Sequence, residues 1–219
     1  MKQVNMSAVH KILSEEFKKY PSVPVVDLIQ VQTKDPFKVL VATILSARTN
    51  DRTTVNACKR LFAKVKKQSD LKKLSENEIQ KLIYPVGFYK NKAGFLKELP
   101  IVLKNEFNGK VPDNVDDLLK LPGVGRKTAN LVVAIGFDKP AICVDVHVNR
   151  IMNRLGYVKT KNPFETEMAL RKKLPIRYWT TINSILVAHG QHICKPISPF
   201  CSKCRIRIYC NRVGVKSGR

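Results

Sequence analysis

The chain has 219 residues, with 40 Lys and Arg against 17 Asp and Glu, and its formal net charge is +23. A hydrophobic fraction of 44% is sufficient for a packed core in one compact domain or two small lobes, and it excludes a disordered basic tail. The apolar runs are shorter than the ~18 residues of a membrane span, and the N-terminus lacks the apolar segment of a signal peptide. We therefore expect no membrane partner, and the positive charge favours a polyanion such as nucleic acid, with a ribosomal protein as one alternative.

Apolar residues at helical spacing predict that almost the whole chain is helical. The helix starts are marked by residues that can cap them, namely Ser7, Asp35 followed by Pro36, Asp51, and Ser75 paired with Glu78. The best candidates for β-strands are VPVV (23–26) and AICVDV (141–146), and both are short. The pattern therefore predicts an all-α fold.

The segment VDDLLKLPGVGRKTANLVVAI (115–135) predicts two helices joined by a tight turn. The first is short and can pack its leucines inward, and the second begins at about Arg126, with Leu131, Val132 and Ile135 on its buried face. The glycines in Gly123-Val124-Gly125 leave the backbone of the turn accessible, so the free N–H groups at the second helix could hold a phosphate. An ordinary helical hairpin is the alternative, and the net charge favours phosphate binding.

LPGVGRKTAN (121–130) followed by VDVH (144–147) resembles the helix-hairpin-helix and Gly/Pro…Asp motif of base-excision DNA glycosylases, in the endonuclease III branch. The similarity extends from about Asp35 to Cys210. It implies an all-α, two-lobed fold with a DNA-binding cleft between the lobes. One lobe would be a six-helix barrel over 29–139 that contains the hairpin, and the other, an iron–sulfur lobe, would combine 1–28 with 140–219.

The resemblance implies catalytic roles for Lys127 and Asp145. As a neutral amine, Lys127 would attack C1′ of the damaged nucleoside, and the resulting Schiff base would permit β-elimination. The charge of the helix N-terminus disfavours the ammonium form there. Plain charge pairing with a phosphate is the alternative for Lys127. Asp145 is expected to cap the next helix and to stabilise positive charge that develops on the sugar.

Four of the six cysteines lie close together in the sequence, at Cys194, Cys201, Cys204 and Cys210, and this spacing favours metal ligation over disulfides. By chemistry alone they could hold zinc or an iron–sulfur cluster. The x6-x2-x5 spacing matches that of the endonuclease III loop, so the resemblance implies a [4Fe-4S] cluster with a structural role in a basic loop. Cys58 and Cys143 are expected in the core.

In the resembled family, two loops enter the DNA duplex from the edges of opposite lobes. They correspond here to 46–51 and 87–92, in which Arg48 replaces a common Gln and Phe88 a common Leu. Phe88 can wedge between bases, whereas its alternative is a core aromatic. Arg48 can donate two hydrogen bonds to guanine, which predicts a preference for lesions opposite G, and a phosphate contact is its alternative.

The resemblance therefore implies a base-excision repair glycosylase with AP-lyase activity that removes oxidised pyrimidines from duplex DNA. A mismatch glycosylase for T or U opposite G is the alternative on the same fold. Two alternatives belong to other functional classes. One is a non-catalytic helix-hairpin-helix DNA-binding protein with a structural metal, and the more remote one is a ferredoxin-like redox protein. We expect a monomer in the cytoplasm, bound to double-stranded DNA with a damaged base or an abasic site.

Overall fold

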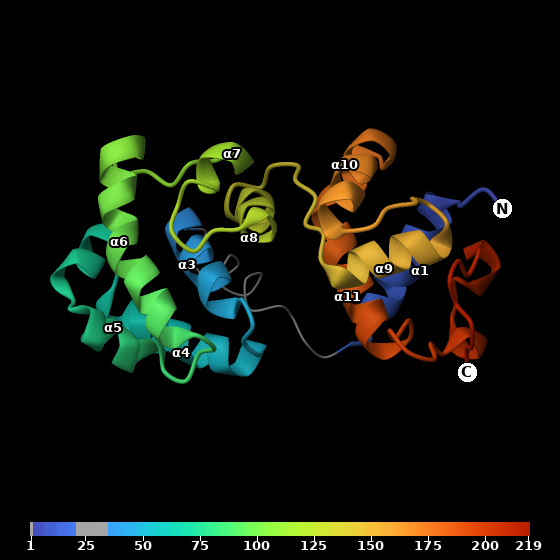
Figure 1. Cartoon of the computed structure of the whole chain (residues 1–219), viewed down its shortest axis with the longest axis horizontal. Helices are drawn as coiled ribbons and strands as arrows, with labels where there is room; N and C mark the ends of the chain where they lie inside the picture. Colours follow the sequence, from blue (N-terminus) through green and yellow to red (C-terminus); the bar gives the residue numbers. More distant parts are fainter. Residues whose placement is uncertain (1, 21–34) are drawn as a thin grey trace. The chain divides into compact units, whose positions relative to one another are not determined.

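The computed structural model describes residues 2–20 and 35–219, and within these ranges it is helical, with no β-strand (Figure 1). The α-helices are α1 Met6–Phe17, α3 Pro36–Ser46, α4 Asp51–Lys64, α5 Glu76–Ile83, α6 Tyr89–Phe107, α7 Val115–Leu118, α8 Arg126–Leu131, α9 Val146–Leu155, α10 Pro163–Lys173 and α11 Trp179–His192. A π-helix spans Val132–Gly136, and 3₁₀ helices span Gln68–Lys73, Ile176–Tyr178, Cys201–Lys203 and Arg207–Tyr209. None of the helices in the described ranges combines the length and apolar character that crossing a bilayer requires.

The chain divides into two compact units, Val23–Lys139 and Met1–Ser22 with Pro140–Arg219. The strand candidate at 23–26 and the lobe boundary expected near residue 28 lie outside the described residues. The second strand candidate, 141–146, is wrong. Residues 141–144 are buried but have no strand partner, and α9 begins at Val146.

In the unit Val23–Lys139, helix α3 contributes more buried hydrophobic residues to the core than any other helix. It packs against α4, α6, α8 and the π-helix, and Val39, Leu40 and Val41 are fully buried. This explains why its sequence is apolar on every side rather than on one face. Figure 1 shows α3 between α5 and α6 on one side and α7 and α8 on the other, with α4 below it.

Side-chain caps fix where several helices begin. The predicted caps Asp35 on α3 and Ser75 with Glu78 on α5 are confirmed. Two other predictions are one or two residues off. Asn5, not Ser7, caps α1 by accepting from the Ala8 N–H, and Asn50, not Asp51, caps α4. In both cases an Asn lies just before the expected cap, and its side-chain oxygen reaches the orphan N–H groups of the first turn.

The hairpin of α7 and α8 forms as predicted, but its burial pattern differs. Leu119 is exposed, and Leu131 and Ile135 are only partly buried, whereas Val133 and Ala134 are buried. For Val133, Ala134 and Ile135 the reason is the π-helix that continues α8. A π-helical turn contains more residues than an α-helical turn, so it rotates the following side chains relative to an α-helical register.

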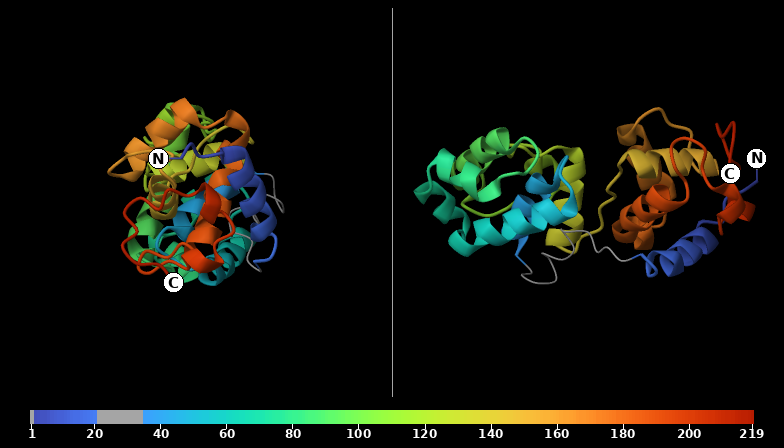
Figure 2. Two further views of the ribbon diagram at one scale, coloured as in Figure 1. Left: turned by 90° about the vertical axis from the view of Figure 1, so that its right-hand side faces the viewer. Right: turned by 90° about the horizontal axis from the view of Figure 1, so that it is seen from below.

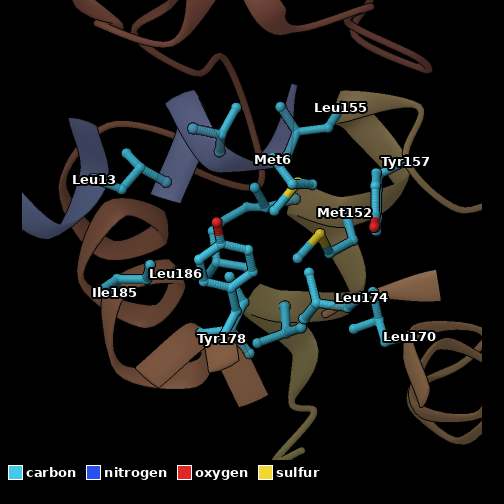
Figure 3. Close-up of a cluster of buried hydrophobic side chains, with 14 of the residues drawn as sticks. Met6, Leu13, Met152, Leu155, Tyr157, Leu170, Leu174, Tyr178, Ile185 and Leu186 are labelled. Carbon is cyan, nitrogen blue, oxygen red and sulfur yellow. The ribbon is translucent and has the colours of Figure 1, made fainter. Parts of the chain in front are cut away.

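The unit Met1–Ser22 with Pro140–Arg219 has its own core between α1, α9, α10 and α11 (Figure 3). Met6 and Leu13 of α1 meet Met152 and Leu155 of α9 and Leu186 of α11 there. The segment that carries the four clustered cysteines also packs on this core, because Ile206 is buried within it.

The N-terminal and C-terminal segments of this unit lie side by side (Figure 2). The Asn211 side chain accepts from the Lys2 N–H at 2.8 Å and donates to the Lys2 carbonyl at 2.9 Å. It also donates to the Leu155 carbonyl at 2.9 Å, at the end of α9. One amide side chain thus ties both ends of the chain to the core that supports the cysteine segment.

Candidate nucleic-acid interface

The turn between α7 and α8 leaves backbone accessible at Gly125. Gly123 has a φ of +73°, and a Cβ there would lie 2.5 Å from the Phe95 ring, so only glycine suits this position. A Cβ on Gly125, the N-cap residue of α8, would meet nothing within 4 Å. The Val124 side chain is buried, and therefore only its backbone can face a ligand. The hairpin presents main-chain groups, which is the arrangement that phosphate binding uses.

Lys127 and Asp145 both lie at helix N-termini. Lys127 is the second residue of α8 and is exposed. Asp145 is partly buried and caps α9, where its Oδ1 accepts from the backbone N–H groups of His147 at 2.8 Å and Val148 at 2.9 Å. The capping role expected for Asp145 is confirmed, and these two bonds hold its carboxylate rigidly. Lys127 belongs to the unit Val23–Lys139, and Asp145 belongs to the other unit.

Arg150 connects α9 with the segment that carries the cysteines. Its guanidinium donates to the carbonyl of Cys194 at 2.9 and 3.2 Å and to that of Gly190 at 3.2 Å. It also lies 3.1 Å from Nδ1 of His147, two residues after Asp145. A Cβ on Gly190 would come within 2.4 Å of the same Nδ1, so glycine is required for α11 to pass this ring. Burial lowers the pKa of Arg150, whereas the negative charges of Cys194 and, to a smaller extent, Asp145 oppose that shift.

The two loops expected to enter DNA lie side by side. The expectation that they belong to opposite lobes is wrong, because both belong to the unit Val23–Lys139. The Arg48 guanidinium carbon lies 5.4 Å from the centroid of the Phe88 ring, and Phe88 is 60% exposed, which argues against a core aromatic. The Gly87 N–H donates to Thr49 Oγ1 at 3.0 Å, and a Cβ on Gly87 would lie 2.5 Å from the Arg48 carbonyl oxygen. The packing of α3 to α6 therefore brings Arg48 and Phe88, which are 40 positions apart in the sequence, into contact.

A buried lysine lies beneath these loops, and no sequence pattern indicates it. Lys92 is 5% exposed, and its Nζ donates to the carbonyls of Leu45 at 2.8 Å and Ala47 at 2.6 Å. Burial lowers the pKa of Lys92 to about 8. The surrounding KNK run is typical of a solvated surface, so only the packing of α6 on α3 distinguishes Lys92 from the exposed Lys90.

The lowered pKa of Lys92 predicts how stability depends on pH. Between pH 8 and 10 the unfolded chain still holds the proton on Lys92 while the folded chain loses it, so the free energy of unfolding should rise with pH by about 2 kcal/mol through this group. Chemical denaturation of the wild type and Lys92→Met across this range isolates the effect, because all other lysines are shared. Parallel stability curves for the two proteins would contradict the prediction.

The four clustered cysteines lie in the segment that follows α11, and all six cysteines, each within the described ranges, are free thiols. Burial, and secondarily the negative charge of neighbouring thiolates, raises the pKa of Cys204 to about 12 and raises that of Cys210. Cys194 contributes to both shifts. An Nη1 of Arg154 lies 3.3 Å from Cys194 Sγ, and Nε2 of the buried His189 lies 3.7 Å from Cys204 Sγ.

This donor set suits a metal group by its chemistry. Four thiols influence one another electrostatically, and a cationic centre would offset the mutual repulsion that opposes their ionisation. Across the described ranges, however, no three side chains among His, Cys, Asp and Glu converge as a ready-made ligand set. The cysteines therefore qualify as ligands by residue type and by their electrostatic influence on one another. Cys58 and Cys143 are buried in the core, as expected.

Comparison with known proteins identifies the family. The sequence model described as "HhH-GPD superfamily base excision DNA repair protein" matches residues 41–175, more than half of the chain. Endonuclease III of Thermotoga maritima is 48% identical over 176 residues, which are 80% of this chain and 83% of the relative.

Two solved structures are similar over almost their whole length. One is a trapped covalent intermediate of endonuclease III with DNA, an estranged-adenine complex, with a TM-score of 0.78, 33% identity, and coverage of 96% of this chain and 97% of the other. The other is a thermostable thymine-DNA glycosylase, with a TM-score of 0.80, 29% identity, and coverage of 94% and 95%. The chain therefore belongs to the endonuclease III family of helix-hairpin-helix base-excision repair proteins, which are DNA glycosylases with AP-lyase activity.

Proposed function

We propose that this enzyme removes oxidised pyrimidines from duplex DNA, with Lys127 as the nucleophile. The observation that carries the proposal is the exposed position of Lys127 in the first turn of α8, directly after the accessible backbone of Gly125. A turn that binds a phosphate of the damaged strand would bring the sugar next to this amine. The covalent intermediate of the similar endonuclease III with DNA is consistent with an enzyme nucleophile.

In the proposed reaction the neutral amine of Lys127 attacks C1′, and the C1′–N bond to the base breaks with its electron pair leaving on the base. Loss of the amine proton and opening of the sugar ring give an imine between Lys127 and C1′. Removal of a proton from C2′ then drives β-elimination, in which the C3′–O bond breaks and the 3′ phosphate leaves. Hydrolysis of the imine releases Lys127.

Asp145 is proposed to supply negative charge near the sugar. Its carboxylate is fixed by two backbone N–H groups of α9 and is only partly buried, so it remains an acceptor of fixed orientation. Such a group can stabilise positive charge that develops at C1′ as the base departs, and it can accept the proton of the attacking amine. Capping and catalysis are compatible, because the capping hydrogen bonds restrict rotation of the carboxylate and hold it in the fixed orientation that catalysis needs.

The proposed DNA contacts fall into two groups. The turn Gly123-Val124-Gly125 would bind a phosphate through main-chain N–H groups, which positions the strand without reading its sequence. Arg48 and Phe88 would enter the duplex, Phe88 filling the space of the flipped nucleotide and Arg48 contacting the base left behind. The exposed contact between Arg48 and Phe88 supports this proposal. Because the two side chains lie together, one of them can fill the space of the flipped nucleotide while the other contacts the base opposite it.

Arg48 predicts a preference for lesions opposite guanine. Replacing Arg48 with Gln should reduce the ratio of excision opposite G to excision opposite A by about tenfold, because a bidentate Arg–guanine contact discriminates by ~1–3 kcal/mol. Single-turnover rates on matched duplexes measure this ratio. An unchanged ratio with uniformly weaker DNA binding would assign Arg48 to a phosphate.

A second candidate substrate is T or U mispaired with G. The same Arg48 favours it, and the similarity to a thymine-DNA glycosylase supports excision of thymine on this fold. Lys127 would perform the same chemistry in either case. The two substrates differ only in the base that leaves.

We also propose that Cys194, Cys201, Cys204 and Cys210 hold a [4Fe-4S] cluster. When bound, the cluster would crosslink the basic segment after α11 and so stabilise its fold. Arg150 and Arg154 of α9 would hold the backbone of this segment in place, through the carbonyls of Cys194 and Lys195. A structural role is favoured because this segment packs on the core around Ile206.

Cys204→Ser should abolish the visible absorption of the purified protein and its content of about four iron atoms per chain. It should also lower the melting temperature, because the segment loses its crosslink. Cys143→Ala, which changes a buried cysteine outside the segment, is the control and should retain iron. Zinc in place of iron, or full iron content in Cys204→Ser, would contradict the assignment.

The substrate is tested by borohydride trapping. The enzyme is incubated with duplexes that contain an abasic site, thymine glycol, or U or T opposite G, and covalent complexes are separated under denaturing conditions. We expect trapping on the abasic site and on thymine glycol. Trapping on G-paired U or T but not on thymine glycol would favour the second candidate, and tight binding without trapping on any duplex would leave a non-catalytic DNA-binding role.

A further inference from the structure

Lys92 occupies a position that the proposed chemistry does not use. It is buried, and its charge is balanced by oxygen atoms of one short segment. Nζ donates to the carbonyls of Leu45 and Ala47 at 2.8 and 2.6 Å and approaches Thr49 Oγ1 at 3.4 Å. These acceptors lie at the C-terminal end of α3 and in the loop that carries Arg48. A buried ammonium with such partners fixes the loop firmly, because moving the loop would leave a buried charge without partners.

The same residue also holds the second loop through its main chain. The Lys92 N–H donates to the Phe88 carbonyl at 3.1 Å, in the first turn of α6. Lys92 is thus joined to Phe88 by its backbone and to the Arg48 loop by its side chain. Thr49 completes the link, because its hydroxyl accepts from the Gly87 N–H at 3.0 Å.

Both residues that this arrangement supports have an unusual backbone. Arg48 has a φ of +55° and Phe88 a φ of +58°, in the left-handed region that residues other than glycine rarely adopt. Such conformations persist only where surrounding contacts determine them, and they concentrate at functional sites. Here two residues with such a conformation lie next to each other, since the Arg48 guanidinium carbon is 5.4 Å from the Phe88 ring centroid.

We propose that Lys92 is a positioning residue that holds Arg48 and Phe88 as one rigid unit, and that it thereby sets how strongly excision depends on the base opposite the lesion. The second part rests on the proposed function of Arg48 and Phe88 in reading DNA. The first part concerns the free protein and does not depend on it. Lys92 itself touches no DNA in this proposal and acts through the loops.

The chain contains a matched control in the same helix. Lys97 of α6 also donates to two backbone carbonyls, those of Lys72 at 2.9 Å and Leu74 at 2.6 Å. These acceptors belong to the segment before α5, away from Arg48 and Phe88 in the sequence. Lys97→Met therefore removes the same kind of contact and the same charge, while it leaves the two reading loops intact.

The first experiment measures amide hydrogen exchange in the free proteins. In Lys92→Met the amides of Thr49 and Gly87 should exchange at least about tenfold faster than in the wild type, since local opening becomes easier. In Lys97→Met they should exchange at the wild-type rate. Unchanged protection of Gly87 in a folded Lys92→Met protein would overturn the positioning role.

The second experiment measures single-turnover excision of one lesion opposite G and opposite A. Lys92→Met should reduce the G-to-A ratio toward that of Arg48→Ala, and the double variant should show no further reduction, because both changes remove the same interaction. Lys97→Met should keep the wild-type ratio. Faster exchange with an unchanged ratio in both Lys92→Met and Arg48→Ala would retain the positioning role and refute the reading role of Arg48. An unchanged ratio in Lys92→Met alone would refute the link between Lys92 and specificity.

Thr49→Val provides a second route to the same test if Lys92→Met does not fold. It keeps the shape of the side chain and removes the hydroxyl that accepts from the Gly87 N–H. Gly87 exchange should rise and the G-to-A ratio should fall, both by less than in Lys92→Met. If Thr49→Val leaves both quantities at wild-type values, the two loops are not coupled and the proposal is wrong.

Discussion

Lys127→Ala is expected to eliminate the borohydride-trapped complex and to reduce both base excision and strand cleavage by about a thousandfold or more, as the removal of an essential nucleophile does. DNA binding should persist, because the hairpin turn that would bind phosphate is unchanged. The melting temperature should also stay close to that of the wild type, since Lys127 is exposed and Ala is a good helix former. Denaturing gels, single-turnover kinetics and a binding titration measure the three quantities.

Lys120→Ala is the control for the loss of one positive charge at the same hairpin. Lys120 lies in the turn after α7, pairs with Asp117 at 2.8 Å, and is more than half exposed. If Lys127 only attracts phosphate, the two variants should weaken DNA binding similarly and both should still form the trapped complex. Trapping by Lys127→Ala at the wild-type level would therefore refute the nucleophile.

Asp145→Asn is the second change for which we expect a large effect. Asn is as good an N-cap as Asp, so the free energy of unfolding should change by no more than about 0.5 kcal/mol. The carboxylate charge is lost, however, and single-turnover excision should fall by about 10²- to 10⁴-fold, the range of general acid–base catalysis. The combination of wild-type stability and slow excision would separate the catalytic role from the capping role.

Asp35→Asn is the matched control, because Asp35 caps α3 in the same way and accepts from the Phe37 N–H at 2.9 Å. It should change neither stability nor excision appreciably. Equal excision rates in the two variants would show that Asp145 serves only as a cap. Slow excision in Asp145→Asn together with a lower melting temperature would point instead to a distorted α9.

The proposed arrangement of Arg48, Phe88 and Lys92 has a consequence for how substrate choice can change within this fold. The side chain that would read the opposite base lies on a loop whose conformation depends on a residue in another helix. Substitutions at Lys92, Thr49 or Gly87 can thus alter specificity without touching DNA. Gly87 is the most sensitive of these, because a Cβ there would lie 2.5 Å from the Arg48 carbonyl oxygen.

The sequence by itself determined the features that depend on neighbours within about four positions. Apolar residues at helical spacing predicted the helices, and Asp35-Pro36 and Ser75 with Glu78 placed two helix starts correctly, because a cap bonds to N–H groups two or three residues away. The hairpin motif also sufficed to predict the family, which the comparisons bear out. The glycines of the motif are informative about the turn, because Gly123 has a positive φ that few other residue types adopt.

Only the tertiary structure decided what depends on contacts between distant segments. The segment 141–146 has strand-like residues but finds no strand to pair with, and the π-helix after α8 changes which side chains are buried. The burial of Lys92 beneath the Arg48 loop follows from the packing of α6 on α3, and nothing in the KNK run indicates it. Arg48 and Phe88 are 40 residues apart, and they meet because the helices between them fold back on one another. The physical reason is that side-chain packing, unlike capping and helical periodicity, is set by residues that are remote in sequence.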